Sequence, residues 1–387
     1  MNPSAAARDA PGAIDRVLEH LGRLSEIDGA PGHEDAVLAY VADALTGVDE
    51  VRIDAHGNLL VRRDTRRPGP TVVMAAHLDE VALVVTGIED DGFLRIAALG
   101  STVGELVAGR VVRLAGRFGV VGAVAGHYRS AERPMASDPL RAGEAYVDVG
   151  ARSAQAARGA GIDVGTPVVL WNPLRRFGVD RSLIVGKALD DRIGCALLLT
   201  LLEREAPAAG RLVVAFTVQE EVGYRGAGAV AHALRVDGPI DLAVAVDTIA
   251  CADTPGSSVR GAAPHRLGGG PVVAMATGPR GTGLILRPQV AGLFAAVARD
   301  AGVALQRVVF EGGDNDATAM AWAGAGAPAG SISIPRRYAH SAVEVADIDD
   351  IGAAYAWLRA LLARMATWPP AWGAAPFAPP APGGGVA

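Results

Sequence analysis

Short hydrophobic runs alternate with longer segments of helical periodicity over most of this chain. The short runs are almost entirely apolar and end at polar residues, which is typical of buried strands; they lie at 71–76, 211–218, 241–246 and 331–334. The helical segments lie at 34–47, 191–205, 226–234 and 350–365. Strands that alternate with helices in this way predict an α/β fold, with a mostly parallel sheet flanked by helices.

The pattern changes between residues 84 and 178. Short β-type segments follow one another there, separated by Gly, Asp and Pro turns, and most of them have no clear helix between them. Such a block indicates a small β-barrel or sandwich inserted into the α/β domain. We therefore expect a main domain in two pieces, residues 12–83 and 179–366, around a smaller β-rich domain at 84–178.

Both ends of the chain have compositions typical of disordered segments, residues 1–11 and 367–387. The C-terminal segment is rich in Pro, Gly and Ala without periodicity, so we expect it to bury too little surface to become ordered. The N-terminal segment lacks a basic start followed by an apolar run, which argues against a secretory signal. No stretch approaches the roughly 20 unbroken apolar residues that cross a bilayer, so no membrane partner is expected.

Composition narrows the class of partner and the compartment. The formal net charge of -6 argues against nucleic acid, because phosphate binding needs a concentrated basic surface. Cys195 and Cys251 are the only cysteines, which argues against a disulfide scaffold and favours a reducing, cytoplasmic compartment. Lys187 is the only lysine, and it lies in the segment GKALDDR, where the sequence leaves its role open.

Ionisable residues follow the ends of the predicted strands. These residues are His77, Asp79, Glu220, Glu221, Asp247 and His340. The carboxyl ends of strands in an open α/β sheet form the ligand crevice, so we expect these side chains to converge. Asp190 and Asp191 precede a predicted helix, whose N-terminus favours a carboxylate that can point at the same crevice.

The residue types indicate a metal site. Two imidazoles with several carboxylates suit zinc, cobalt or manganese better than calcium. Asp79, two residues after His77, is placed to accept the other ring N–H of a metal-binding histidine. Of two adjacent glutamates, one can bind metal while its neighbour acts as a base for water. Each feature alone is common in structural roles, but their joint placement at strand ends favours a metal hydrolase.

Longer segments carry a resemblance to a known family. They are GAPGHED (29–35), HGNLL (56–60), AAHLDEVALVV (75–85), GFLRIAALG (92–100), AYVDVGA (145–151), GKALDDRIG (186–194), VQEEVGYRGA (218–227), AVDTIACADTPG (245–256) and SIPRRYAHSAVEV (333–345). With these segments in the family's order, the chain resembles the M42 family of metallo-aminopeptidases, which includes glutamyl aminopeptidase and the tetrahedral aminopeptidases.

This resemblance implies roles for the residues at the strand ends. It implies two divalent metal ions per subunit, with zinc the first expectation and cobalt or manganese the alternatives. His77 and Asp247 would bind one ion, Glu221 and His340 the other, and Asp190 would bridge them. The remaining two residues would not bind metal: Glu220 would be the general base, and Asp79 would orient His77.

The resemblance also implies the architecture and the partners. The fold would be zinc-exopeptidase-like, with the main domain as the catalytic metallopeptidase domain and the insertion as a lid or oligomerisation domain. Short peptides would be the substrates, and each would lose its N-terminal residue by attack of activated water. The subunits would form a homo-oligomer, such as the dodecameric tetrahedra common in the family.

One departure from the family bears on substrate preference. The family tends to have Gly-Gly-Thr-Asp-Ala upstream of the last histidine, whereas this chain has GGDNDA at 312–317. Asp316 fills the usual aspartate position, and Asp314 is either a harmless loop residue or an acid that alters the pocket. Arg336 and Arg337 could favour an acidic substrate side chain or could pair with nearby acids. The sequence therefore does not indicate which N-terminal residue is removed.

Other functions remain as alternatives. A dinucleotide fingerprint at 226–231 fails, because seven residues separate the predicted strand from its first glycine. A serine hydrolase is disfavoured because no G-x-S-x-G elbow occurs. A metal-dependent deacylase, a glycan hydrolase like the relatives that carry an endoglucanase label, and an inactive assembly protein stay open. Glycan hydrolysis that survives complete metal removal would identify a glycosidase.

Overall fold

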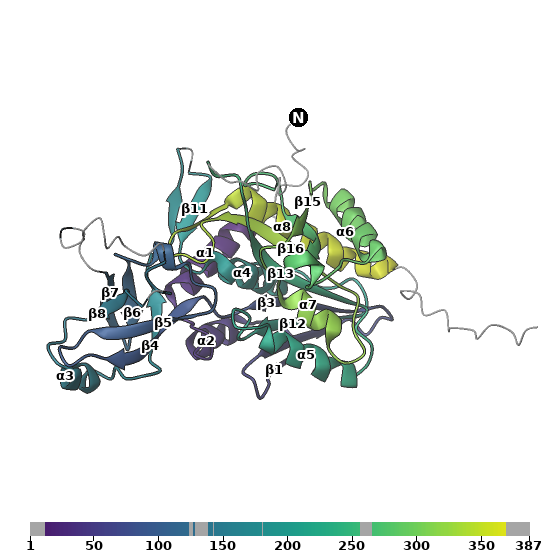
Figure 1. Cartoon of the computed structure of the whole chain (residues 1–387). Coiled ribbons are helices and arrows are strands. Elements are labelled where there is room, and N and C mark those ends of the chain that lie inside the picture. The colour runs from purple at the N-terminus through teal and green to yellow at the C-terminus, as the bar shows by residue number, and fades with distance from the viewer. Residues whose placement is uncertain are drawn as a thin grey trace, which may run out of the picture.

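The computed structural model describes residues 12–123, 127, 138–141, 143–179, 181–255 and 265–368. The segments expected to be disordered, 1–11 and 367–387, lie outside this part of the chain, except that Thr367 ends a short 3-10 helix and Trp368 follows it. Figure 1 shows two parts side by side, a larger α/β part and a smaller β-rich part. None of the helices described is long and apolar enough to cross a membrane.

A large mixed sheet forms the centre of the α/β part. Its strand order is β1 (Glu50–Ile53), β2 (Leu59–Asp64), β12 (Arg211–Thr217), β3 (Thr71–His77), β13 (Leu242–Ala250), β16 (Ala329–Arg337), β17 (Glu344–Asp347), β11 (Leu183–Gly186) and β10 (Arg175–Phe177). Two further strands, β14 (Val272–Thr277) and β15 (Gln306–Phe310), extend it from β16. All four strands predicted from hydrophobic runs lie at the middle of this order, as β12, β3, β13 and β16.

The expectation of a mostly parallel sheet is wrong for the sheet as a whole. The four central strands are parallel to one another, but β2 is antiparallel to β12 and β17 is antiparallel to β16. Short connections explain the antiparallel pairs β1–β2 and β16–β17, because parallel neighbours need a crossover of a dozen or more residues. Only residues 54–58 join β1 to β2, which therefore pair as a hairpin.

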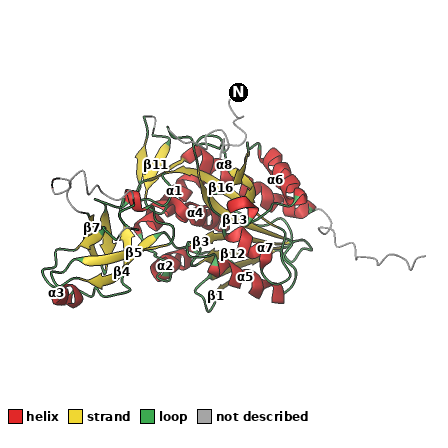
Figure 2. Ribbon diagram, viewed as in Figure 1, coloured by secondary structure: helices red, strands yellow, loops and turns green. Residues whose placement is uncertain are grey.

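Helices cover both faces of the sheet, as Figure 2 shows. One face packs on α1 (Ala13–Glu26), α2 (Asp35–Ala44), α4 (Leu189–Arg204), α6 (Pro288–Ala301) and α8 (Ile348–Arg364). The other face packs on α5 (Arg225–Val236) and α7 (Asp316–Trp322). The alternation along β3 fixes this division, since Val72 and Met74 point to the first group of helices and Val73 to the second.

The smaller part is a closed barrel. Its strand order is β4 (Ala82–Ile88), β5 (Leu94–Leu99), β8 (Tyr146–Asp148), β7 (Arg117–Gly122), β6 (Val111–Leu114) and β9 (Pro167–Leu170). A separate hydrophobic core fills it, with the short helix α3 (Ala154–Gly159) packed against this core. The barrel supports the expected β-rich insertion. Its strands lie between residues 82 and 170, whereas β10, inside the expected range of 84–178, pairs with the large sheet.

Candidate metal centre

The central strands deliver their polar residues to one edge of the sheet. His77 is the last residue of β3 and lies opposite Thr217, the last residue of the parallel neighbour β12. Glu220 and Glu221 follow in the next loop, while Asp247 lies within β13, which extends further than the predicted strand. Parallel strands place their carboxyl ends together, so residues far apart in sequence meet here.

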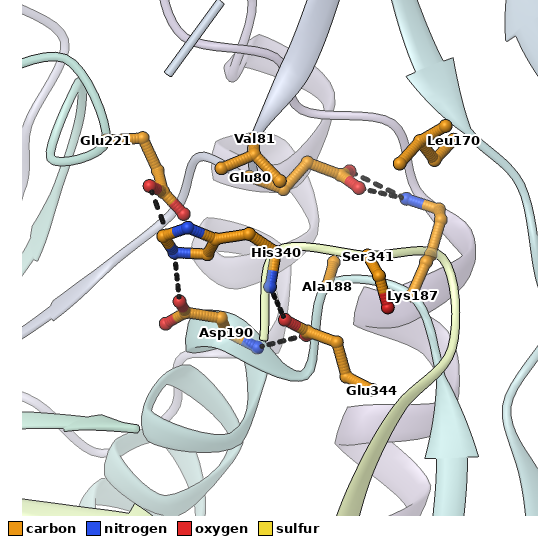
Figure 3. Close-up of a pocket in the computed structure, with 10 residues that line it drawn as sticks. All are labelled: Glu80, Val81, Leu170, Lys187, Ala188, Asp190, Glu221, His340, Ser341 and Glu344. Carbon is orange, nitrogen blue, oxygen red and sulfur yellow. Dashed lines mark hydrogen bonds and ion pairs between the residues drawn. The ribbon is translucent and has the colours of Figure 1, made fainter. Parts of the chain in front are cut away.

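Asp190 lies between two imidazoles. Its Oδ1 is 3.3 Å from His77 Nε2, and its Oδ2 is 3.3 Å from His340 Nε2. Asp247 Oδ1 approaches His77 Nε2 to 3.9 Å on one side. Glu221 Oε2 lies 3.5 Å from His340 Nε2 on the other side, as Figure 3 shows. The five residues expected to bind metal therefore converge, with Asp190 in the middle.

Glu220 and Asp79, the two residues expected to act without binding metal, also lie in this cluster. Glu220 Oε2 is 3.9 Å from His77 Nε2. The carbonyl oxygen of Asp79 lies 3.1 Å from His77 Nδ1, and its carboxylate Oδ1 lies 3.4 Å from the same nitrogen. That carboxylate also accepts the backbone N–H groups of Glu220 and Glu221. Asp79 therefore contacts His77 and holds the loop that carries the two glutamates.

The start of α4 has an unusual backbone that separates two neighbouring acids. Asp190 and Asp191 have non-helical φ and ψ angles and are joined by a cis peptide bond. The Asp191 carboxylate accepts the backbone N–H groups of His77, at 3.3 Å, and Gly194, at 3.0 Å. Asp191 is also within ligand distance of His77 and Asp247. The sequence indicated that Asp191 could point at the crevice, but it was not assigned to the metal ions.

Two further buried residues hold the site together, Arg336, whose role the sequence left open, and Glu344, which sequence reasoning missed. Arg336 forms an ion pair with Asp190, and its Nη1 donates to Glu344 Oε1 at 2.6 Å. The Glu344 carboxylate also accepts the backbone N–H groups of His340, at 2.8 Å, and Asp190, at 3.1 Å. The matched segment SIPRRYAHSAVEV contains both residues, but neither contact is visible in the sequence.

The open question about the two arginines is answered by their partners. Arg336 is almost fully buried and pairs with Asp190 and Glu344, while Arg337 pairs with Asp253 at 2.7 Å. Both guanidinium groups are therefore engaged by acids of the chain itself. Their presence gives no support to a preference for acidic substrate side chains.

Asp314 lies in the wall of the cleft that opens beside the centre. The cleft has a volume of about 270 Å³ and also contains Tyr224 and Phe310. The hydroxyl groups of Thr277 and Thr318 donate to Asp314 Oδ1, the former at 2.7 Å. Asp316, which fills the family's aspartate position, is instead buried, and its carboxylate accepts the Thr217 hydroxyl at 2.6 Å.

The buried carboxylates of the centre favour the binding of additional positive charge. Burial raises the pKa of Glu220 well above its usual range and that of Glu221 to about 7. Burial also opposes ionisation of Asp190, but Arg336, His340 and His77 together hold the pKa of Asp190 well below its usual range. Buried carboxylates therefore outnumber the cations that face them.

The donor set fits divalent metal ions. Three groups offer ligand atoms within 4.8 Å of one another: His77 with Asp191 and Asp247, His77 with Glu220 and Glu221, and Asp190 with Glu221 and His340. Glu221 Oε1 is buried and has no hydrogen-bond partner among the described residues, as expected of an oxygen reserved for a cation. Mixed imidazole and carboxylate donors suit zinc, cobalt or manganese.

Comparisons with known proteins find related sequences and similar structures. The sequence profile of the family described as M42 glutamyl aminopeptidase matches residues 57–356. The lysyl aminopeptidase of Pyrococcus furiosus is 29% identical over 90% of this chain and 97% of its own length. An aminopeptidase from the archaeon Desulfurococcus kamchatkensis has a similar structure, with a TM-score of 0.82 and 32% identity over 90% of this chain and 95% of that one. The TET1 peptidase of Pyrococcus horikoshii, which can assemble into a tetrahedron or a large octahedral shell, gives a TM-score of 0.75 and 27% identity over 90% of this chain and 99% of its own.

Proposed function

Because this chain belongs to the M42 family of aminopeptidases, which are hydrolases, we propose that it removes N-terminal residues from peptides with two divalent metal ions and a glutamate base. The observation that carries the proposal is the position of Asp190, whose two carboxylate oxygens each lie 3.3 Å from a different imidazole. A carboxylate placed in this way can be shared by two cations.

The ligand assignment follows from these contacts. His77 and Asp247 would hold one ion, Glu221 and His340 the other, and Asp190 would bridge them. When bound, two such ions acidify water and polarise the carbonyl of the peptide bond. Zinc is the first expectation, because imidazole and carboxylate donors are its usual oxygen and nitrogen ligands.

A residue of the protein itself would transfer the proton from the attacking water to the leaving amine. Glu220 lies beside the proposed ligands, with its Oε2 3.9 Å from His77 Nε2, and burial favours its protonated form, so it can take a proton and release it again. It would accept the proton of the attacking water and pass it to the leaving amine as the carbon–nitrogen bond breaks. Asp79 would keep Glu220 in place through its backbone, and the small cleft would admit the end of a peptide.

Two variants test the proposal on purified protein. Glu220→Gln should keep two zinc ions per subunit, measured by elemental analysis, while turnover of aminoacyl-p-nitroanilides falls about 10²- to 10⁴-fold. His340→Ala should lose one ion. Glu50→Gln, on the exposed strand β1, is the matched control and should change neither quantity. Unchanged turnover in Glu220→Gln would refute the base, and wild-type protein that takes up no zinc would refute the metal site.

We also propose that the subunits assemble into a closed homo-oligomer. The support is the similarity to the TET1 peptidase of Pyrococcus horikoshii over 90% of this chain. Sedimentation velocity on the purified protein should give a particle several times the subunit mass, such as a dodecamer. A monomer at micromolar concentration would contradict this.

A further inference from the structure

The only lysine of the chain is buried in an ion cluster behind the candidate metal centre. Lys187 Nζ donates to both carboxylate oxygens of Glu80, at 2.6 and 2.9 Å, and to the carbonyl of Ile27 at 3.2 Å. Arg192 Nη2 donates to Glu80 Oε1 at 3.3 Å. All three residues are at most 3% exposed. We call Lys187, Glu80 and Arg192 the Lys187 cluster.

This cluster closes a ring with the metal centre. Glu80 follows His77 by three residues, and Lys187 precedes Asp190 by three residues. At one end of the two segments, Glu80 and Lys187 form an ion pair. At the other end, His77 Nε2 lies 3.3 Å from Asp190 Oδ1. Arg192 adds a second link from Glu80 to the chain just beyond Asp190. The separation of His77 from Asp190 therefore depends on the ion pair at the other side of the ring.

The backbone at the start of α4 is irregular. Ala188 has a φ of 53° and Asp190 is non-helical, so regular helix geometry does not fix the Asp190 backbone. Glu344 holds the Asp190 N–H from one side. Figure 3 shows the pair of Lys187 and Glu80 on another side of the same small cavity, which Asp190, Glu221 and His340 also line.

The far side of the cluster is fixed to the core. Arg192 Nη1 donates to the carbonyls of Leu24, at 2.5 Å, and Ile27, at 3.2 Å, at the end of α1. The backbone N–H of Glu80 donates to the carbonyl of Gly29 at 2.9 Å, and a Cβ at Gly29 would lie 2.5 Å from Arg192 Nη2. The cluster is therefore a rigid support rather than a loose surface pair.

We propose that the Lys187 cluster is a positioning device that sets the separation of His77 and Asp190 and so tunes the affinity of the centre for metal. The inference rests on the proposed function. None of its three members reaches the cleft, so each acts through His77 or Asp190 and does not contact substrate. A cluster that served stability alone would show no separate effect on metal affinity.

A double-variant cycle separates the two roles. Glu80→Gln leaves Arg192 without its carboxylate and Lys187 with only the more distant Asp28, at 3.6 Å, while Lys187→Met removes one cation, so both single variants should lower the unfolding temperature. The double variant restores the charge balance and should recover part of that loss. The double variant still lacks the ion pair between positions 80 and 187. At least one zinc dissociation constant should therefore stay about 10- to 100-fold above wild type. Competition with a chromophoric chelator measures it.

A control variant separates a loss of stability from a loss of zinc affinity. Leu358→Ala, in the core of α8, should lower the unfolding temperature with unchanged zinc affinity. Zinc affinity that returns to wild type in the double variant would overturn the inference and leave the proposed function intact. Wild-type protein that binds no zinc would overturn both.

A second variant carries the test if the double variant does not fold. Lys187→Arg keeps the charge but replaces a compact ammonium with a longer planar group, so it should fold and still bind zinc several-fold more weakly. Wild-type zinc affinity in Lys187→Arg would then overturn the inference.

Discussion

Asp79 accepts the backbone N–H of Glu220 through Oδ1 at 3.0 Å. The other oxygen of the same carboxylate accepts the backbone N–H of Glu221 at 3.1 Å. Asp79 is completely buried, and its carbonyl oxygen lies 3.1 Å from His77 Nδ1. One carboxylate therefore ties the loop after β12, which carries the candidate base and a candidate ligand, to the loop that directly follows His77, a candidate ligand at the end of β3.

Asp79→Asn should weaken this tie without changing side-chain size. An amide has a single acceptor oxygen, so one of the two backbone N–H groups would face an NH₂ group and lose its partner. We expect kcat/KM to fall about 10- to 100-fold and zinc to bind more weakly. Asp64→Asn, at the partly exposed end of β2 away from the centre, is the control and should behave like wild type. Activity of Asp79→Asn within twofold of wild type would show that the tie is dispensable.

Glu344 plays the equivalent part on the other side of the centre. Its carboxylate accepts the backbone N–H groups of Asp190 and His340 and the guanidinium of Arg336. Glu344→Gln should leave one of these donors unpaired and displace His340, so we expect about one zinc ion per subunit to be lost on dialysis. Elemental analysis measures this, with Glu89→Gln in the barrel as the control. Full zinc content together with full activity would contradict the role.

The sequence predicts the centre of the fold better than its edges. The four central strands are recognisable because each is a buried apolar run, such as TVVMAA in β3. In the edge strand Glu50–Ile53 two apolar residues alternate with two polar ones, but the run is only four residues long and all four are exposed, so it contains no buried apolar run of the kind that marks the central strands. The helix α1 was missed although its buried residues Ala13, Val17, Leu21 and Leu24 have helical spacing, so that signal was available.

In the candidate site, too, the sequence predicts some features and not others. Residue type and position after a strand were sufficient to select His77, Glu221 and His340. The contribution of Glu344 depends on the distance between its carboxylate and two backbone N–H groups, one of them 154 positions away in sequence. No local pattern encodes such a distance. The same holds for the contact between Lys187 and Glu80, which lie 107 positions apart.

Two helix glycines should respond oppositely to alanine. A Cβ at Gly194 in α4 would lie 2.4 Å from both Asp191 Oδ2 and the carbonyl of Val246, so it would displace the start of the helix. A Cβ at Gly292 in α6 would meet nothing within 4 Å. Gly194→Ala should lower the free energy of unfolding by about 1–3 kcal/mol or more, whereas Gly292→Ala should raise it by up to about 1 kcal/mol. Denaturant titration measures both, and equal effects would contradict the close packing at Gly194.

Titration of Asp350 should make the stability of the fold depend on pH. This residue lies in the first turn of α8, where its oxygens accept the backbone N–H groups of Gly268 and Gly270 at 2.8 and 2.7 Å. Burial raises the pKa of Asp350 to about 7, and nearby Asp347 and Asp349 add to the rise, although the two N–H groups oppose it. The unfolded chain has the ordinary pKa of about 3.9. Between these values the folded protein holds a proton that unfolding releases, so this contribution to stability falls as the pH rises towards 7.

Asp350→Asn removes the titration and should isolate this contribution. The amide loses one hydrogen bond at every pH, which is a constant offset, but it never becomes charged. The unfolding temperature of Asp350→Asn relative to wild type should therefore increase from pH 5 to about pH 8 and then level off. In free energy, the difference should change by at most about 1.4 kcal/mol per pH unit. A difference that stays flat over this range would show that Asp350 is ionised in the folded protein throughout, with the two N–H groups outweighing its burial.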